Sequence, residues 1–262
     1  WITQENIDGF RCDVASAVPL DFWKDAISKL RAEKEIFMLA EAGEANLLVG
    51  TELFDMAYGW DRHHVFNEMA KSDDAVNLWK ESIKRDTNLY EADDILMTFV
   101  TNHDENSWNG TVRERMGDAA ELLTALSFVA PGMPLIYSGQ EYDLNKRLHF
   151  FEKDSFPKLH GKTMQLLQQL GALKNNHNAL ATGKNSGSFK RINTTLDNQI
   201  LAFERGKEGD TLLVVANLSK NYAQFTMPYQ GAFKRYQDFK TKRLLPSYQY
   251  DMKPWEFWIL IK

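Results

Sequence analysis

Ile7-Asp-Gly-Phe-Arg-Cys-Asp-Val-Ala15 is the stretch that decides the fold of this chain. It has the composition of a short buried strand, and Arg11 and Asp13 stand two residues apart near its carboxyl end. Residues i and i+2 of a strand point to the same face, so both side chains are expected to emerge together. The guanidinium lowers the pKa of the carboxylate and keeps it ionised at neutral pH. Asp13 is therefore a candidate nucleophile, although an isolated pair of this kind is more often a structural ion pair.

Two later apolar runs also end on acidic residues. Ile36-Phe-Met-Leu-Ala-Glu41 closes on Glu41, and Ile95-Leu-Met-Thr-Phe-Val-Thr-Asn-His-Asp104 closes on Asn102, His103 and Asp104. Helical sequence follows each run. In a (β/α) barrel the catalytic groups stand at the carboxyl ends of the strands. The three acids are therefore expected to share one face.

Taken in order, Gly-Phe-Arg-x-Asp, an apolar strand ending in Glu, and Asn-His-Asp resemble the α-amylase superfamily of retaining glycoside hydrolases. The segment from Asp13 to Pro19 is similar to the maltodextrin-degrading, neopullulanase-like branch, because Ser16-Ala17 stands where many amylases carry Lys-His. The resemblance covers essentially the whole chain but only part of a family member, since the Asp…Asn-His motif of an earlier strand is absent. The chain begins at Trp1 without methionine or signal sequence, and we expect it to be the C-terminal portion of a longer protein.

The chain divides into two patterns near residue 183. Before it, five strands are expected at about 7–13, 36–41, 51–57, 95–101 and 133–137, with helical periodicity around 18–30, 61–92, 119–129 and 164–175. In the family the nucleophile lies on the fourth strand, so the resemblance implies an α/β fold in which residues 1–182 form a partial (β/α)8 TIM barrel, about strands 4–8. Residues 183–262 contain short apolar runs separated by turn residues such as Gly206, Gly209, Pro228 and Gly231, which predicts an antiparallel β-sandwich domain.

The resemblance also implies roles for the acids. Asp13 would be the nucleophile and Glu41 the acid/base, held in a less polar setting so that it stays protonated until it donates. Retention requires these two carboxyl groups to lie about 5–5.5 Å apart. Asp104 would hold hydroxyls of the distorted sugar. Substrate contacts are expected from Asn102, His103 and Arg11, the last of which also orients Asp13.

Aromatic residues follow the strand ends. Tyr58, Trp60 and Trp108 are candidates for stacking on sugar rings, and packing under a loop is the alternative for each. Other residues have structural interpretations. Glu44 and Glu105 are expected to be solvated loop acids, Asp55 and Asp61 to form a cap or an ion pair, and Trp23 and Trp79 to lie in the core.

The bulk composition excludes several classes of protein. The 262 residues carry a formal net charge of −5, which argues against nucleic-acid binding, and no apolar run is long enough to span a membrane. The single cysteine, Cys12, cannot form an internal disulfide and is expected to be a small buried hydrophobe. No cofactor is predicted, and no metal-ligand cluster is evident. If the full-length protein binds calcium, its ligands are not evident in this chain. Cellular location stays open.

The leading hypothesis is a retaining hydrolase of α-1,4-glucans and maltooligosaccharides that acts through a glycosyl-enzyme intermediate. A transglycosylase or isomerase of the same family is an alternative, because water and a sugar hydroxyl attack the same intermediate. A non-catalytic carbohydrate-binding or scaffolding relative is another, disfavoured because all three acids are present. As a fragment, the chain is expected to be inactive alone and to self-associate through the open barrel edge, where Phe10, Phe37 or Met38, and Val100 would be exposed.

Overall fold

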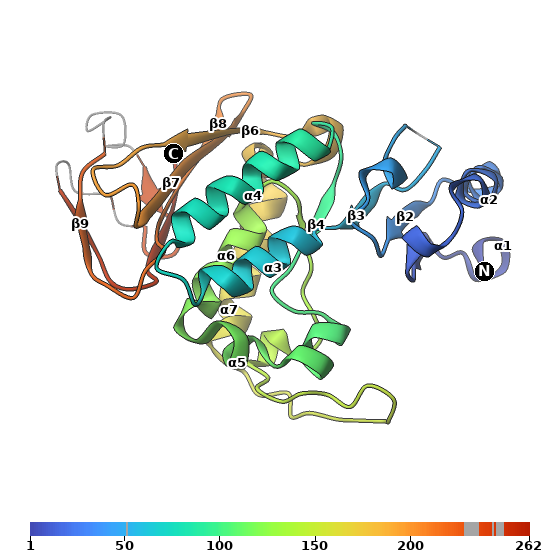
Figure 1. Cartoon of the computed structure of the whole chain (residues 1–262), viewed down its shortest axis with the longest axis horizontal. Helices are drawn as coiled ribbons and strands as arrows, with labels where there is room; N and C mark the ends of the chain where they lie inside the picture. Colours follow the sequence, from blue (N-terminus) through green and yellow to red (C-terminus); the bar gives the residue numbers. More distant parts are fainter. Residues whose placement is uncertain (51, 228–235, 243, 245–248) are drawn as a thin grey trace.

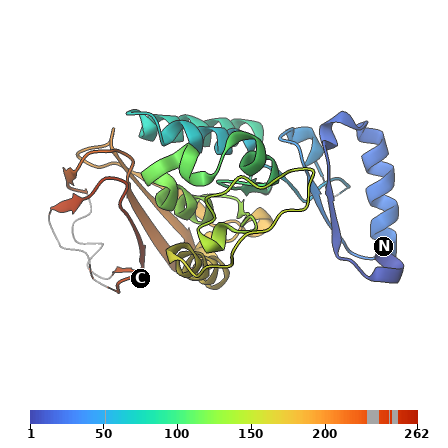
Figure 2. The same ribbon diagram turned by 90° about the horizontal axis from the view of Figure 1, so that it is seen from below.

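The computed structural model describes residues 1–50, 52–227, 236–242, 244 and 249–262. The chain runs from an N-terminal arm at one end of an elongated molecule, through a central group of helices, to an antiparallel sheet at the other end (Figure 1). In the view from below, α2 lies alongside the first strands, well apart from the C-terminal sheet (Figure 2). Among the described residues, no helix is both long and apolar enough to cross a membrane.

The N-terminal half contains five parallel strands in chain order. They are β1 Gly9–Cys12, β2 Phe37–Ala40, β3 Met56–Tyr58, β4 Leu96–Thr98 and β5 Met133–Pro134. Each strand pairs in parallel with the next, which confirms the expected parallel arrangement. This order leaves β1 and β5 as the edges of the sheet within the described part of the chain.

The connections between these strands are mostly helical. The α-helices are α1 Ile2–Glu5, α2 Leu20–Glu33, α3 Trp60–Met69, α4 Ala75–Leu89, α5 Val112–Met116, α6 Ala120–Val129 and α7 Lys162–Asn176. Short helical turns are η1 Ala15–Ala17, η2 Ala45–Leu47, the π-helix η3 Glu105–Asn109, η4 Gly117–Ala119, η5 Gln140–Tyr142, η6 Asn178–Leu180 and η7 Gly183–Asn185.

The predicted helical region 61–92 is two helices rather than one. The break between α3 and α4 falls at Ser72-Asp73-Asp74, where the Ser72 hydroxyl accepts a hydrogen bond from the Asp74 N–H at 2.9 Å. Serine and aspartate side chains compete in this way for backbone groups and favour turns over helix interiors.

The predicted strand at 51–57 is displaced toward its C-terminus. Residues 52 and 53 lie in a turn and a bend, and β3 begins only at Met56; residue 51 lies outside the described residues. Asp55, just before β3, bonds to β2 through both its backbone and its side chain. Its N–H donates to the Met38 carbonyl at 2.9 Å, and its carboxylate accepts the Met38 N–H at 2.7 Å and pairs with Arg31 at 2.9 Å.

Gly9 allows β1 and β2 to approach closely. A side chain at this position would meet the backbone oxygen of Phe37 at 1.8 Å, so only glycine fits where Gly9 pairs with Phe37. The register continues through Arg11–Leu39 to Cys12–Ala40. This brings Asp13 and Glu41, the residues that follow each strand, side by side.

The C-terminal part is antiparallel, as expected. Its strands are β6 Ser188–Ile192, β7 Ile200–Lys207, β8 Asp210–Asn217, β9 Ala223–Phe225, β10 Gln237–Asp238, β11 Tyr250–Met252 and β12 Phe257–Ile261. They form a sheet of order β10-β12-β8-β7-β6 and a second pair, β11-β9. Two expected turn positions, Pro228 and Gly231, lie outside the described residues.

Both faces of the larger antiparallel sheet are covered. One face packs against β9 and β11, with Val215 and Phe225 in the same buried cluster. The other face packs on the helices, where the Phe203 ring stacks on Trp79 with centroids 6.1 Å apart. Trp79 is thus a core residue, as predicted, and the helices and the sheet share one core. A boundary at 182/183 stays a prediction.

The apolar residues expected at the open edge divide between two faces. Of the alternatives Phe37 and Met38, Phe37 is the exposed one at 44%. Val100 is buried, so the expectation is wrong for Val100. Phe10 points to the face of the sheet opposite to Arg11, because neighbouring residues of a strand point to opposite faces. There it packs against the cluster that contains Ile27 of α2. A separate buried cluster on the parallel strands consists of Met56, Tyr58, Met97 and Phe99.

Candidate active site

Arg11 joins the first two predicted acids. Its Nη1 lies 2.6 Å from Asp13 Oδ1, and its Nη2 lies 2.6 Å from Glu41 Oε1. The two carboxylates come from neighbouring positions in the parallel register, so the strand geometry and the guanidinium fork together bring them to one point. The structure therefore brings Arg11, Asp13 and Glu41 together as the sequence predicted.

The environment of Asp13 favours its ionised form. The hydrogen bond from Arg11 lowers the pKa of the Asp13 carboxyl, and smaller contributions come from a hydrogen bond with Glu41 and from the positive charge of His103. The side chain is 77% exposed. An ionised and accessible carboxylate has the two properties that a nucleophile needs.

Glu41 is more enclosed than Asp13, but its setting is polar. Besides Arg11, its carboxylate accepts the backbone N–H of Val14 at 2.7 Å. The expectation of a less polar setting for Glu41 is wrong in this structure. Val14 adopts the left-handed conformation (φ 42°), which is rare and strained for a β-branched residue. Strained backbone of this kind clusters at functional sites.

Tyr58 contacts Arg11, and Trp60 packs against Tyr58. Tyr58 is buried, and its hydroxyl accepts a hydrogen bond from Arg11 Nε at 3.2 Å. Its ring packs against Trp60 and Phe99, with centroids 5.3 and 5.7 Å away. The expectation that the Tyr58 ring stacks on a sugar is therefore wrong for this structure; Tyr58 instead supports the guanidinium that holds the two carboxylates. Trp60 is half-buried beside it.

The Asn102-His103-Asp104 segment presents two of its three side chains. Asn102 is buried, and its Oδ1 accepts the Glu105 N–H at 2.8 Å, so it shapes the start of η3 instead of facing a ligand. His103 and Asp104 are partly exposed, with His103 Nε2 and Asp104 Oδ2 3.4 Å apart. The charge of His103 is the smallest of the contributions that lower the pKa of Asp13.

Glu105 is not a solvated acid, and this prediction is wrong. Its side chain is buried, with Oε2 2.9 Å from His63 Nε2 and 3.9 Å from Arg115 Nη1. Burial opposes its ionisation, but the hydrogen bonds from His63 and Asn109 and the charge of Arg115 outweigh burial and lower the pKa of Glu105. Sequence reasoning missed this network because His63 and Arg115 lie on helices whose periodicity carries no sign of a buried acid.

Comparisons with known proteins identify the family to which this chain belongs. A family model described as "Alpha amylase, catalytic domain" matches residues 1–179. The chain belongs to the α-amylase catalytic-domain family. Family membership accords with the Asp13, Glu41 and Asp104 motifs and with their convergence at the strand ends.

The relatives are distant and longer. The α-amylase MalA of Haloarcula japonica is 24% identical over 85% of this chain, and the intracellular maltogenic amylase of Bacillus subtilis is 26% identical over 78%. The chain spans about a third of the length of each, 33% and 37%. A noncanonic maltogenic α-amylase from Thermotoga neapolitana superposes with a TM-score of 0.83 at 22% identity, covering 100% of this chain and 62% of that one. At this identity the likeness shows the fold: a TIM-barrel-like α/β unit with a sheet domain.

Three other acids of this α-amylase-family chain, Glu44, Asp55 and Asp61, are either exposed to solvent or form ion pairs. Glu44 is exposed in its loop, as expected. Asp55 pairs with Arg31, and Asp61 pairs with Arg85 at 3.0 Å, which confirms both as ion-pair residues. Within the described ranges, no three His, Cys, Asp or Glu side chains are grouped so that they could hold a metal ion.

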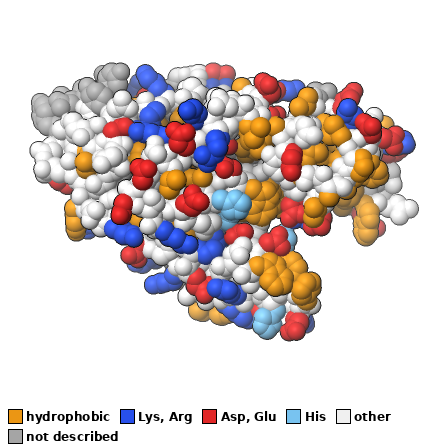
Figure 3. All heavy atoms as spheres, in the orientation of Figure 1, with side chains coloured by type: hydrophobic (Ala, Val, Ile, Leu, Met, Phe, Trp, Pro, Cys, Tyr) orange, Lys and Arg blue, Asp and Glu red, His pale blue; other side chains and the backbone are white. Residues whose placement is uncertain are grey.

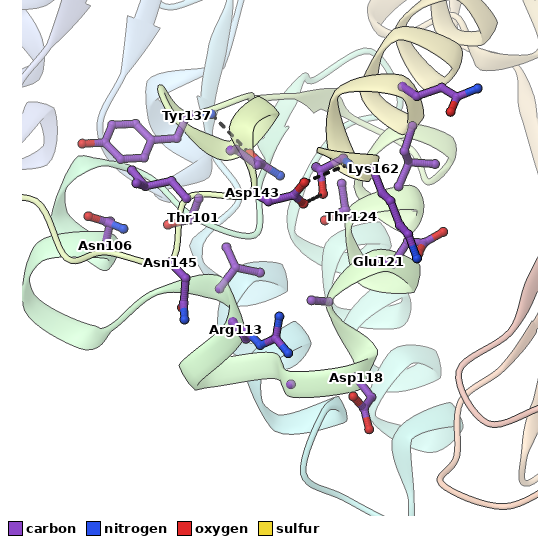
Figure 4. Close-up of a pocket in the computed structure, with 18 of the residues that line it drawn as sticks. Thr101, Asn106, Arg113, Asp118, Glu121, Thr124, Tyr137, Asp143, Asn145 and Lys162 are labelled. Atoms are coloured by element: carbon purple, nitrogen blue, oxygen red, sulfur yellow. Dashed lines mark hydrogen bonds between the residues drawn. The ribbon is translucent and has the colours of Figure 1, made fainter. Parts of the chain in front are cut away.

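A cavity of about 820 Å³ lies on the β5 side of the sheet, outside the cluster around Arg11 (Figure 4). Thr101, Asn106 and Tyr137 line its inner end, and Lys162 of α7 and Glu121 of α6 line its outer end. Burial raises the pKa of Tyr137, and the charge of Asp104 adds to the effect. Neither Asp13 nor Glu41 lines this cavity, so it is separate from the cluster around Arg11.

Proposed function

We propose that this chain carries the acids of a retaining glycoside hydrolase that cleaves α-1,4-linked glucose oligomers. The single observation that carries the proposal is the contact of two carboxylates, Asp13 and Glu41, with one guanidinium at the carboxyl ends of adjacent parallel strands. Membership of the α-amylase family supports the substrate class, as do relatives named maltogenic amylases.

In the proposed reaction Asp13 attacks the anomeric carbon while Glu41 gives its proton to the departing glycosidic oxygen. The C–O bond to the leaving sugar breaks, and an ester bond between Asp13 and the glucosyl unit forms. Glu41, now ionised, then takes a proton from water, and the water oxygen displaces Asp13. Arg11 suits Asp13 to the role of nucleophile, because its hydrogen bond lowers the pKa of the Asp13 carboxyl and favours the ionised form.

The contact through Arg11 supports retention over inversion. An inverting pair needs about 6.5–9.5 Å between the carboxyl groups to admit a water molecule. Both carboxylates lie 2.6 Å from nitrogens of one guanidinium, and this shared contact favours the shorter, retaining separation.

We assign supporting roles to the neighbouring residues. Asp104 and His103, partly exposed beside Asp13, would hold hydroxyls of the reacting sugar. Arg11 keeps Asp13 ionised, and the Tyr58 hydroxyl orients Arg11 by accepting a hydrogen bond from its Nε. Asn102 acts through the loop conformation rather than by direct contact.

We also propose that β1 to β5 correspond to the last five strands of an eight-stranded barrel. The five parallel strands in chain order support this layout, as does the 62% coverage of the Thermotoga neapolitana structure. Residues from the rest of a barrel would then enclose Asp13, whose side chain is open to solvent in this chain.

The test is a trapping experiment on the protein at the full length that its gene encodes. A 5-fluoro-α-glucosyl fluoride should add one glucosyl unit to Asp13, detected by peptide mass spectrometry, and the first product from maltoheptaose should be the α-anomer by NMR. Asp13→Asn and Glu41→Gln should abolish turnover, whereas Glu44→Gln, an exposed acid in the adjacent loop, should leave it unchanged. A β-anomer or a label on another residue would refute the assignment. Products longer than maltoheptaose would show that a sugar competes with water as acceptor.

A further inference from the structure

A buried histidine lies against the loop that carries His103 and Asp104 but takes no part in the proposed reaction. His63 of α3 is 1% exposed, so it does not reach the surface that is hollowed between the N-terminal arm and the projecting loop after β5 (Figure 3). Its ring stacks on Phe99, with centroids 4.6 Å apart and an interplanar angle of 16°. Burying a polar ring is unfavourable unless its nitrogens are hydrogen-bonded, so the partners of these nitrogens indicate what the residue does.

Both ring nitrogens of His63 face oxygen atoms. Nδ1 lies 3.1 Å from the carbonyl oxygen of Phe99, which can only accept, so Nδ1 carries a proton. Nε2 lies 2.9 Å from Glu105 Oε2 and 3.1 Å from Asn67 Nδ2. Burial opposes the ionisation of Glu105, but the hydrogen bond from His63 is the largest of the effects that lower the pKa of Glu105. His63 therefore bonds to a strand-end carbonyl and to a carboxylate at the same time.

Arg115 of α5 makes a similar pair of contacts from the other side of the loop. Its side chain is buried, with Nη2 donating to the Val100 carbonyl at 2.7 Å and Nε donating to the Gly110 carbonyl at 2.9 Å. Its Nη1 donates to Asn67 Oδ1 at 2.6 Å. Because Asn67 Nδ2 faces His63, this amide joins the two cationic side chains into one network.

These contacts lie on both sides of the residues that the proposed function assigns to the substrate. Phe99 and Val100 precede the segment Asn102-His103-Asp104, and Glu105 and Gly110 follow it. Asp104 is the N-cap residue of η3, and Glu105 is the first residue of this π-helix. A displacement of Glu105 would therefore move the Asp104 backbone directly. Short π-helical turns are rare and are found frequently at functional sites.

We propose that His63 is a positioning residue for the proposed reaction: together with Arg115, it fixes both ends of the 99–110 loop and so presents Asp104 to the reacting sugar. The proposal rests on the proposed function and assigns to that site two residues that do not touch the substrate. A buried polar network whose members are satisfied is rigid. Misplacing a reacting or binding group by about 1 Å can lower a rate roughly 100-fold, so a remote support of this kind has a measurable effect.

Steady-state kinetics with maltoheptaose, on the protein at its encoded length, test this role. His63→Phe keeps an aromatic ring against Phe99 and removes both hydrogen bonds. We expect kcat to fall about tenfold or more and KM to change less than about threefold, because Asp104 is proposed to hold the sugar in its distorted form. His63→Gln, which retains a donor for Glu105, should lose less activity than His63→Phe, and it provides the same comparison should His63→Phe not fold.

Asp86→Asn is the matched control. Arg62, the neighbour of His63 on α3, is also buried and pairs with Asp86, but it donates to the Pro131 carbonyl at 2.6 Å and not to the 99–110 loop. Asp86→Asn should lower stability in urea, because it weakens a buried ion pair, and should leave kcat unchanged.

A double-mutant cycle tests whether His63 acts through Asp104. In a protein that already carries Asp104→Asn, His63→Phe should lower kcat by less than about a further twofold, because the group that it positions has been removed. An activated substrate, α-maltosyl fluoride, keeps the rate measurable in this background. A further tenfold loss would show that His63 acts by another route and would overturn the proposal.

Two other kinetic results would also overturn the proposal. An unchanged kcat in folded His63→Phe would leave the network a structural role alone, and a raised KM with unchanged kcat would contradict a role in the distorted state. If the wild-type protein does not hydrolyse maltoheptaose, the proposed function fails, and amide hydrogen exchange decides whether His63 holds the loop. His63→Phe should speed exchange in peptides covering 102–110 but not in β7 and β8; unchanged exchange in the loop would refute the inference.

Discussion

The two ends of the molecule are packed very differently. No residue of β1 is fully buried, and Asp13 just beyond it is 77% exposed, whereas the last six residues of β8, at the other end, are all buried. The first strand has α2 on one face and open surface on the other, while the larger C-terminal sheet is covered on both faces. The chemistry predicted from the sequence thus lies at the open end, and the densest core lies at the opposite end.

This difference separates what each end contributes. Asp13 and Glu41 at the N-terminal end are held by ion pairs with Arg11 and bury little apolar surface. Substitutions of these two acids should therefore affect the reaction more than the fold. Groups in the C-terminal core should do the reverse, because buried polar atoms without partners are costly.

The largest effect is expected from Asp13→Asn in the protein at its encoded length. Turnover of maltoheptaose should fall by several powers of ten, because the amide cannot form the covalent intermediate. The free energy of unfolding should change little, since the Asp13 side chain is 77% exposed and exposed ion pairs contribute little to stability. Steady-state kinetics and urea denaturation measure the two quantities. Activity within tenfold of wild type would assign the chemistry to another group.

Arg205→Met tests the opposite end. The Arg205 side chain is fully buried and donates to four backbone carbonyls, among them Val129 at 3.0 Å and Ser188 at 3.0 Å. Each carbonyl left without a donor costs about 1–3 kcal/mol, so the substitution should destabilise the fold by roughly 3 kcal/mol or more.

Denaturation in urea measures the effect of Arg205→Met, and Arg113→Met, on the wall of the cavity beside α6, serves as the matched control. Equal stabilities of the two variants would contradict the idea that the central helices and the C-terminal sheet depend on Arg205.

The sequence predicted the site better than it predicted the packing around it. Arg11, Asp13 and Glu41 could be placed because i,i+2 spacing and parallel pairing determine where strand-end side chains go. The burial of Glu105 could not be predicted, because it depends on His63 and Arg115 from separate helices. Such tertiary pairings leave no periodicity in the sequence.

The same limit applies to the apolar residues of the parallel sheet. Phe10 can be placed from the sequence, because side chains alternate along β1 and Phe10 must point away from the face of Arg11, toward α2. Val100 could not be assigned in this way. It lies beyond the end of β4 and is buried in the core of the helices, so its burial follows from the path of the chain after the strand.

Lys174 predicts a pH dependence that belongs to the C-terminal half. Burial, with repulsion from Arg205 as a smaller cause, lowers the pKa of Lys174 to about 7. Between about pH 7 and its usual pKa near 10.5, the folded protein has lost this proton and the unfolded chain keeps it, so stability should rise with pH in that window. One such group contributes a slope of at most about 1.4 kcal/mol per pH unit.

Urea denaturation at pH 7.5, 8.5 and 9.5 would reveal the Lys174 contribution as a difference in slope between the wild type and Lys174→Met. The variant should also be less stable at every pH, because the Gly132 and Leu180 carbonyls lose their donor. Identical slopes would show that Lys174 remains protonated in the fold. Lys24→Met removes a charge from an exposed position of α2 and controls for net charge.

The smallest effect is expected at the open edge of the N-terminal end. Phe37 is 44% exposed on the same face of β2 as Glu41, and β1 leaves a strand edge without a partner in the described part of the chain. Exposed strand edges with apolar neighbours favour pairing between copies, so this 262-residue chain should self-associate at tens of micromolar. Light scattering should show a larger mass that Phe37→Ser reduces several-fold in population. Tyr222→Ser, at the closed end, should leave the mass distribution unchanged; if it dissociates the assembly instead, the contact lies in the C-terminal part and the open edge is not what brings copies together.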